Sequence, residues 1–192
     1  LYDVSRSHVA LFDLRLEILA EVASITPCDD LEQAHLTEAM DWIRSGAALC
    51  RLAKPATPPR HLVSYFLLQD GDHFLLVDHI NAGLWLPTGG HVDPGEHPRG
   101  TVVREAHEEL GVEARFVTPG PVFLSVTETV GQPAGHWDVS LWYLLAGRRD
   151  ADLVFDCSEF TQVRWFGIDD VPYHRSDPHL KRVLSKLAAD PN

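Results

Sequence analysis

One stretch of 23 residues, from Gly90 to Val112, constrains the fold of this chain more than any other. It reads GHVDPGEHPRGTVVREAHEELGV and combines glycines, prolines and a cluster of charged side chains. Proline is tolerated in the first turn of a helix, and glycine favours the left-handed position just past a helix end. The positions of Pro98 and Gly111 therefore predict a helix over residues 99–110.

This helix is expected to have one apolar side and one acidic side. At about 100° per residue, Val103, Ala106 and Leu110 fall on one face, and we expect them to form the buried stripe. Three carboxylates project from the opposite side, those of Glu105, Glu108 and Glu109. The sequence therefore places three acidic groups over little more than one turn of a single helical face.

Acidic side chains at this spacing favour a divalent cation. Like charges four residues apart destabilise a bare helix by a few tenths of a kcal/mol, whereas Mg²⁺ prefers carboxylate and water oxygens. Glu96 lies in the preceding loop, from which it can fold back towards the same carboxylates. Arg104 is spaced to pair with Glu108 and to offset the crowded negative charge. The stretch thus predicts a site that holds a cation against phosphate.

The stretch resembles the Nudix box at each charged and glycine position of that motif. The matching residues are Gly90, Glu96, Arg104, Glu105, Glu108, Glu109 and Gly111. The flanking sequence resembles the Nudix domain over about residues 60–190. Ala106 is a minor departure from the motif, which usually has a larger aliphatic residue at that position. The resemblance implies an α+β fold, an α/β/α sandwich with a mixed sheet. It also implies hydrolysis of a nucleoside diphosphate linked to another group.

The resemblance also implies roles for individual residues. Glu108 and Glu109 would bind Mg²⁺ or Mn²⁺, and Glu105 would bind the ion or orient water. The backbone carbonyl of Gly90 would be a further metal ligand, and Glu96 is a fifth candidate. The expected metal ligands are therefore Gly90, Glu96, Glu105, Glu108 and Glu109. Arg104 is expected to support catalysis by orienting the glutamates.

A further carboxylate outside the motif is expected to act as base or extra ligand, as in many Nudix enzymes. Counting back from Asp169, which resembles the end of the last strand in relatives, indicates Glu159. Glu105 and Glu159 are therefore the two catalytic candidates for deprotonating the attacking water. Asp138 and Glu128 are rivals for this role. Glu159 fits equally well as a loop carboxylate that caps a turn, so both interpretations stay open.

A second group of residues suggests substrate contacts. His136 and Asp138 alternate on an expected strand and share a face, so they could contact a base or ribose or pair at the surface. Trp137 is the aromatic residue that we expect to stack on a nucleobase. Eleven histidines raise the question of zinc. Because those in the box occupy variable positions and no HxxxH or HExxH spacing occurs, no zinc site is expected.

Composition limits the partners. The formal net charge of −12 disfavours a nucleic acid polymer, which requires clustered Lys and Arg, but it permits a small phosphorylated substrate. No apolar run is long enough for a membrane span. Three cysteines without metal-ligand spacing favour a reducing compartment. With no signal-peptide pattern at the start of the sequence, we expect a cytoplasmic protein.

The chain divides at a proline-rich connector around residues 54–60. Residues 1–55 are expected to form a helical extension and residues 60–192 the Nudix hydrolase domain. The second helical run of the extension begins at the cap-like pair Asp29 and Glu32. Its apolar stripes need a partner, and we expect a homodimer contact or a cap over the substrate cleft. Further elements are expected as strands at residues 62–68, 74–77, 114–117, 122–130, 139–145 and 163–166, with a closing helix from Ser176 or Asp177.

Two other functions stay open on the sequence alone. A Nudix-like sensing module would bind a ligand without chemistry, but such modules usually lack a box glutamate, and this chain keeps them all. An isoprenoid diphosphate isomerase would need a cysteine in the pocket, and Cys157 is the one cysteine in the domain portion. Nucleoside triphosphates, ADP-ribose, CDP-alcohols and dinucleoside polyphosphates all stay open as substrates.

Overall fold

A computed structural model describes residues 4–53, 57–129 and 135–189, with side chains described from residue 13 onward. Its helices are α1 (Val4–Ser24), α2 (Asp30–Arg44), α3 (Pro98–Leu110) and α4 (Leu180–Ala189). Its strands are β1 (Arg60–Asp70), β2 (His73–His79), β3 (Leu84–Leu86), β4 (Thr88–His91), β5 (Phe123–Glu128), β6 (Trp137–Ala146) and β7 (Phe160–Gly167). Two short 3₁₀ turns, Ile168–Asp170 and Tyr173–Arg175, precede α4.

The strands form one mixed sheet of seven strands. Its order is β3-β2-β1-β6-β5, with β4 paired to β1 and β7 paired to β2. β1 and β6 run parallel, while the other pairs are antiparallel. At its start β1 is flanked by β4 on one side and by β6 on the other. This arrangement gathers side chains from three strands that are distant in sequence.

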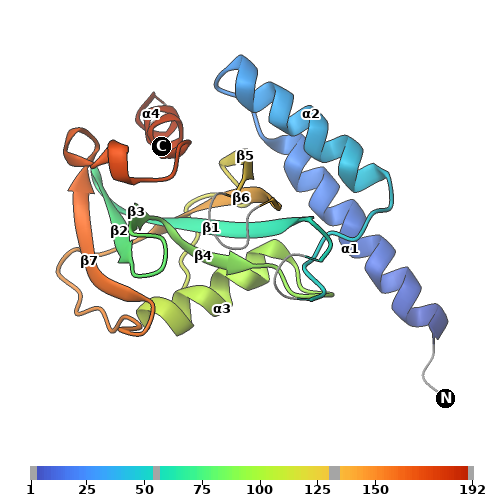
Figure 1. Cartoon of the computed structure of the whole chain (residues 1–192), viewed down its shortest axis with the longest axis horizontal. Helices are drawn as coiled ribbons and strands as arrows, with labels where there is room; N and C mark the ends of the chain where they lie inside the picture. The colour runs from blue at the N-terminus through green and yellow to red at the C-terminus, as the bar shows by residue number, and fades with distance from the viewer. Residues whose placement is uncertain (1–3, 54–56, 130–134, 190–192) are drawn as a thin grey trace.

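Helices cover both faces of the sheet (Figure 1). On one face Val102, Ala106 and Leu110 of α3 join a core cluster with alternate residues of β1, β2, β5 and β6. On the other face Leu180 and Val183 of α4 pack with the intervening residues of those strands. Alternate residues of a strand point to opposite faces, so these strands contribute to two separate cores. The predicted α/β/α sandwich with a mixed sheet is confirmed.

The N-terminal helices extend the first of these cores. Ile18 and Val22 of α1 and Leu36 and Ile43 of α2 are buried in the same cluster as α3. The apolar stripes that α1 and α2 present over the described side chains are thus covered, at least in part, by the sheet of the same chain. Among the helices described here, none has both the length and the apolar character that a membrane crossing requires.

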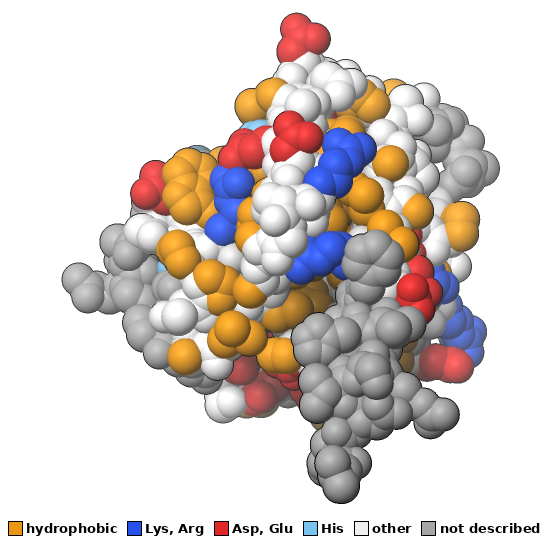
Figure 2. Space-filling view, turned by 90° about the vertical axis from the view of Figure 1, so that its right-hand side faces the viewer, with side chains coloured by type: hydrophobic (Ala, Val, Ile, Leu, Met, Phe, Trp, Pro, Cys, Tyr) orange, Lys and Arg blue, Asp and Glu red, His pale blue; other side chains and the backbone are white. Residues whose placement is uncertain are grey.

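Polar contacts fix α2 to α4. Asp29 caps α2 by accepting a hydrogen bond from the backbone of Glu32, and the predicted cap pair is therefore confirmed. The guanidinium of Arg182 donates to Asp29, and Lys186 donates to Glu32 at 2.8 Å. Figure 2 shows the face of the molecule that lies on the right of Figure 1. Hydrophobic, acidic and basic side chains are interspersed on it.

Some expectations about single elements were wrong. Val103 of α3 is 49% exposed, and Val102 takes the buried position in its place. A helical wheel gives the relative directions of the side chains, but it does not show which of two neighbouring residues will face the sheet. Residues 114–117 do not form a strand, and Phe116 makes only an isolated bridge with Leu145. The closing helix begins at Leu180, a few residues later than expected.

Candidate active site

Helix α3 carries four of the candidate residues, Arg104, Glu105, Glu108 and Glu109. His97 caps its start by accepting from the backbone N–H of Arg99, and Pro98 occupies the first turn. Gly111 ends it with a left-handed φ of 65°, as the sequence predicted. Because Ala106 and Leu110 are fully buried, the intervening charged residues must project from the edge and the outer side of the helix.

Strand β4 contacts both β1 and α3, and its two glycines permit the close approach, Gly89 to β1 and Gly90 to α3. A Cβ atom on Gly89 would lie 2.0 Å from the carbonyl oxygen of Ser64, and its φ of +142° also favours glycine. A Cβ atom on Gly90 would lie 2.1 Å from Oε1 of Glu105. The Gly89 N–H donates to Oε2 of Glu109 at 3.0 Å. The backbone of β4 therefore sets the positions of two box carboxylates.

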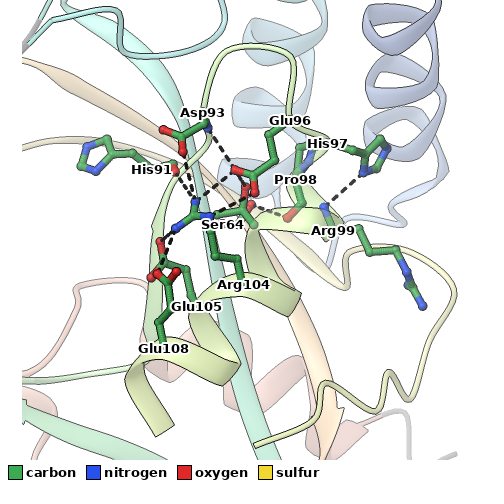
Figure 3. Close-up of polar contacts among 11 residues, drawn as sticks. Ser64, His91, Asp93, Glu96, His97, Pro98, Arg99, Arg104, Glu105 and Glu108 are labelled. Carbon is green, nitrogen blue, oxygen red and sulfur yellow. Dashed lines mark hydrogen bonds and ion pairs between the residues drawn. The ribbon is translucent and has the colours of Figure 1, made fainter. Parts of the chain in front are cut away.

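Arg104 organises the carboxylates at the start of the site (Figure 3). Its guanidinium donates to Glu96 through Nε at 3.1 Å and Nη2 at 3.0 Å. Its Nη1 donates to Glu105 at 2.5 Å and lies 3.6 Å from Glu108. Thr101 also donates to Glu96. Glu96 therefore folds back as expected, and its oxygens accept hydrogen bonds from Arg104, Thr101 and the backbone N–H of Asp93.

A cavity of about 580 Å³ collects most of the candidate residues. Its lining includes Gly90, Arg104, Glu105, Glu108, Glu109, Asp138 and Glu159. Glu96, Glu128, His136 and Trp137 are not among the lining residues. Trp137 is 39% exposed, and its ring lies near the guanidinium of Arg60. The structure thus unites five box residues with Glu159, which the sequence separates from them by 50 residues or more.

Burial and mutual repulsion disfavour negative charge in this cavity. Burial, together with the charge of Glu105, raises the pKa of Glu109 to about 8. Burial also raises the pKa of Glu105, despite the opposing effect of Arg104. For Glu96 burial acts in the same direction, but the hydrogen bonds from Arg104 and Thr101 outweigh it and lower its pKa. The carboxylates of the cavity are therefore not fully neutralised by neighbouring cationic groups. A set of oxygen donors in that state suits Mg²⁺ or Mn²⁺.

A second group of residues in the structure was missed by the sequence analysis. The ligand-capable atoms of His61, His91, His136 and Asp138 all lie within 4.8 Å of one another. Two of these residues, His91 and Asp138, line the cavity as well. No local spacing could have revealed the group, because its members come from β1, β4 and the start of β6. Only the pairing of these strands brings them together.

The sheet, its two helical layers and the box helix facing a carboxylate-lined cavity define a Nudix-type hydrolase. A family profile described as NUDIX domain matches residues 58–187, which is more than half of the chain. The chain therefore belongs to the NUDIX family, and it is a hydrolase of phosphoric anhydride bonds.

Individual relatives agree with this assignment. The chain is 32% identical over 127 residues to the rat (Rattus norvegicus) bis(5'-nucleosyl)-tetraphosphatase [asymmetrical], covering 65% of this chain and 78% of that protein. It is 30% identical over 103 residues to the pig (Sus scrofa) protein of the same name, covering 53% and 68%. A crystal structure of the MutT NUDIX hydrolase from Burkholderia pseudomallei shares the fold. Its TM-score is 0.55 at 22% identity, over 67% of this chain and 98% of that one.

Proposed function

We infer that this chain hydrolyses the P–O–P bridge of a compound in which a nucleoside diphosphate is linked to a further group, with Mg²⁺ or Mn²⁺ as cofactor. The observation that carries this proposal is the convergence of Glu105, Glu108 and Glu109 on one cavity, beside the backbone of Gly90. Dinucleoside tetraphosphates are the substrates to test first, because two relatives at 30% identity or more are named for that activity.

The residues divide into three proposed roles. Glu105, Glu108, Glu109 and the carbonyl of Gly90 would hold the cation. When bound, that ion would neutralise the phosphate oxygens and lower the pKa of water. Arg104 is a positioning residue, since its guanidinium fixes the carboxylates of Glu96 and Glu105.

Glu159 is the proposed general base. It lines the same cavity, where its carboxylate could accept the proton of the attacking water. Asp138 lines the cavity too, whereas Glu128 is an exposed residue of β5. His136 and Trp137 lie outside the lining, so any contact that they make with substrate would involve a part of the molecule beyond the phosphate groups.

Neither alternative function gains support from the site. A sensing module would not require the full set of box glutamates, and all of them are present here. An isomerase would need a cysteine in the pocket, and no cysteine is among the residues that line the cavity. Cys157 is exposed.

We also propose that residues 1–55 act as an extension of a hydrolase domain spanning residues 60–192. The first core cluster joins the two parts, so removal of the extension would expose apolar surface of the sheet. A homodimer and a cytoplasmic location both stay proposals.

Replacement of Glu109 by Gln tests the catalytic proposal. Gln keeps an oxygen that can accept the Gly89 N–H, so the fold should be retained and the melting temperature should change little. Loss of the carboxylate should lower turnover by orders of magnitude. Turnover is measured with a dinucleoside tetraphosphate and Mg²⁺ or Mn²⁺, by chromatography of the released nucleotides. Glu113→Gln, at an exposed position just past α3, is the matched control. Normal turnover of the Glu109 variant would remove this assignment.

A panel of nucleotides identifies the substrate. Dinucleoside polyphosphates, nucleoside triphosphates, ADP-ribose and a CDP-alcohol would be assayed with each cation, with wild-type protein and Glu109→Gln in parallel. The proposal expects cleavage of at least one of them and its loss in the variant. An isoprenoid diphosphate isomerised without hydrolysis would contradict it.

A further inference from the structure

Four side chains at one edge of the cavity form a group that the hydrolytic proposal does not use. His61 lies on β1, His91 on β4 and Asp138 on β6, and His136 directly precedes β6. His61 is the register partner of Asp138, and its same-face neighbour Val63 is the partner of His91. The pairing of three strands therefore directs these side chains towards one point.

The distances suit a small coordinated ion. Nε2 of His61 lies 3.1 Å from Oδ1 of Asp138, Nε2 of His136 lies 3.7 Å from it, and Nε2 of His91 lies 4.0 Å from it. Ligands about 2.0–2.1 Å from a tetrahedral Zn²⁺ stand about 3.3 Å apart. The observed separations bracket this value, so coordination would require only small side-chain movements.

The polar atoms at the centre of the group lack other partners. Nε2 of His61, Nε2 of His91 and Oδ1 of Asp138 are buried without a hydrogen bond in the described structure. The side chain of His61 is fully buried. Buried polar atoms without partners cost free energy, and native structures rarely leave several of them together. A single cation between them would satisfy all three atoms at once.

Outer hydrogen bonds hold two of the rings in a suitable orientation. Nδ1 of His61 lies 3.1 Å from the carbonyl oxygen of Pro58. Because a carbonyl can only accept, Nδ1 is the nitrogen that donates there, and the neutral ring then offers the lone pair of Nε2 to a cation. Nδ1 of His136 lies 2.8 Å from Oγ1 of Thr129. Histidines that bind metal typically use their second nitrogen in this way.

We propose that His61, His91, His136 and Asp138 bind a divalent transition-metal ion such as Zn²⁺, at a site distinct from the glutamates of α3. Three imidazoles and one carboxylate favour such an ion over Mg²⁺, which prefers an all-oxygen shell. The ion would link β1, β4 and β6. It would lie beside Gly90, which directly precedes His91 in β4. It would also place positive charge in the cavity wall that His91 and Asp138 share with the box glutamates.

Metal content and cobalt spectroscopy test this proposal on the full chain. The protein would be freed of any histidine tag, treated with chelator and then given one equivalent of Zn²⁺ or Co²⁺. We expect one tightly held Zn²⁺ per chain after desalting, by mass spectrometry of the metal, and the visible bands of tetrahedral Co²⁺. Zinc should also raise the melting temperature of the chelator-treated protein.

Variants assign the site. Asp138→Asn and His136→Gln should abolish stoichiometric retention of Zn²⁺. Thr129→Val should weaken the affinity by about 10- to 100-fold, because it removes only the outer hydrogen bond. His107→Gln, an exposed histidine of α3, is the matched control and should bind zinc normally. Circular dichroism would confirm that each variant is folded.

The result with Glu109→Gln separates this site from the proposed catalytic one. That variant should keep the zinc and the cobalt spectrum even if its hydrolytic activity is lost. Wild-type protein that retains no zinc and gives no tetrahedral cobalt spectrum would overturn the proposal. So would zinc binding that depends on Glu109 and survives both Asp138→Asn and His136→Gln, because the ion would then occupy the box glutamates.

Discussion

Replacement of Gly90 by Ala tests whether the backbone of β4 sets the catalytic geometry. The added Cβ would lie 2.1 Å from Oε1 of Glu105, and real Cβ atoms essentially never come closer than 3.0 Å. The carboxylate must therefore retreat by at least about 0.9 Å. Because it is the end of a side chain, it can do so without movement of the main chain. The protein should therefore still fold, but the carboxylate of Glu105 should be displaced.

The expected effect on turnover follows from that displacement. A misplacement of about 1 Å in a catalytic constellation can lower the rate about 100-fold, which corresponds to about 2.7 kcal/mol in the activation barrier. We expect kcat to fall by about this factor, while the melting temperature stays within a few degrees of that of the wild type. Both are measured on purified protein, with steady-state hydrolysis at saturating cation and thermal unfolding by circular dichroism.

Two other glycines give matched comparisons. The Cβ atom of Ala at position 100 would meet Cγ of Glu96 at 3.5 Å, an ordinary contact. Since Gly100 lies in α3, Gly100→Ala should keep kcat and gain about 0.5–1 kcal/mol of stability. Gly89→Ala should fail at the level of folding, because its Cβ would lie 2.0 Å from a backbone oxygen. A Gly90→Ala protein with wild-type kcat would refute the reasoning, as would a loss of activity fully explained by unfolding.

Two predictions concern the contact between α2 and α4. Glu32 is fully buried and pairs with Lys186, so Glu32→Ala should cost about 3–5 kcal/mol by leaving the ammonium without a partner. Urea denaturation measures this, and a cost below about 1 kcal/mol would contradict it. Burial and the charge of Arg182 lower the pKa of His179 from 6.5 to about 4. The stability that depends on its neutral form is thus present above about pH 6.5 and lost as pH falls towards 4. Because solvent screens a ring that is only partly buried, the loss should stay below about 3 kcal/mol. In His179→Gln the free energy of unfolding should change less with pH, as measured by urea titrations at pH 7, 5 and 4. A variant with the same change between pH 7 and pH 4 as the wild type would contradict the assignment.

The box helix could be predicted because its determinants are local. Pro98 and Gly111 act through the backbone at the two ends of the helix, and both have the predicted role in α3. The periodicity of the helix also indicated the directions of Glu105 and Glu108. It could not decide between Val102 and Val103 for the buried position, because adjacent residues differ by only about 100°. Packing of the helix against the sheet, a tertiary contact, determines which of the two valines is buried.

The partners of Glu96 and Glu159 depended on contacts between elements. Glu96 was expected among the metal ligands, and that stays a prediction. Its oxygens accept hydrogen bonds from Arg104, Thr101 and the backbone N–H of Asp93, partners that its spacing did not indicate. A sequence does not show which of several nearby groups a loop carboxylate will meet. Glu159 reaches the cavity because β7 pairs with β2, a pairing that brings the start of β7 beside His79. Its place was inferred from a resemblance and not from its own surroundings.

The same argument explains why the histidine group escaped the sequence analysis. Metal sites that can be recognised from a sequence have their ligands at short, regular spacings on one element, as HxxxH does on a helix. Here 30 residues separate His61 from His91, and 45 more separate His91 from His136. The strand register that unites them is set by hydrophobic residues such as Leu62 and Val139, which face the core that α3 covers. The core packing that buries those residues therefore also determines which polar residues meet on the opposite face, beside the cavity.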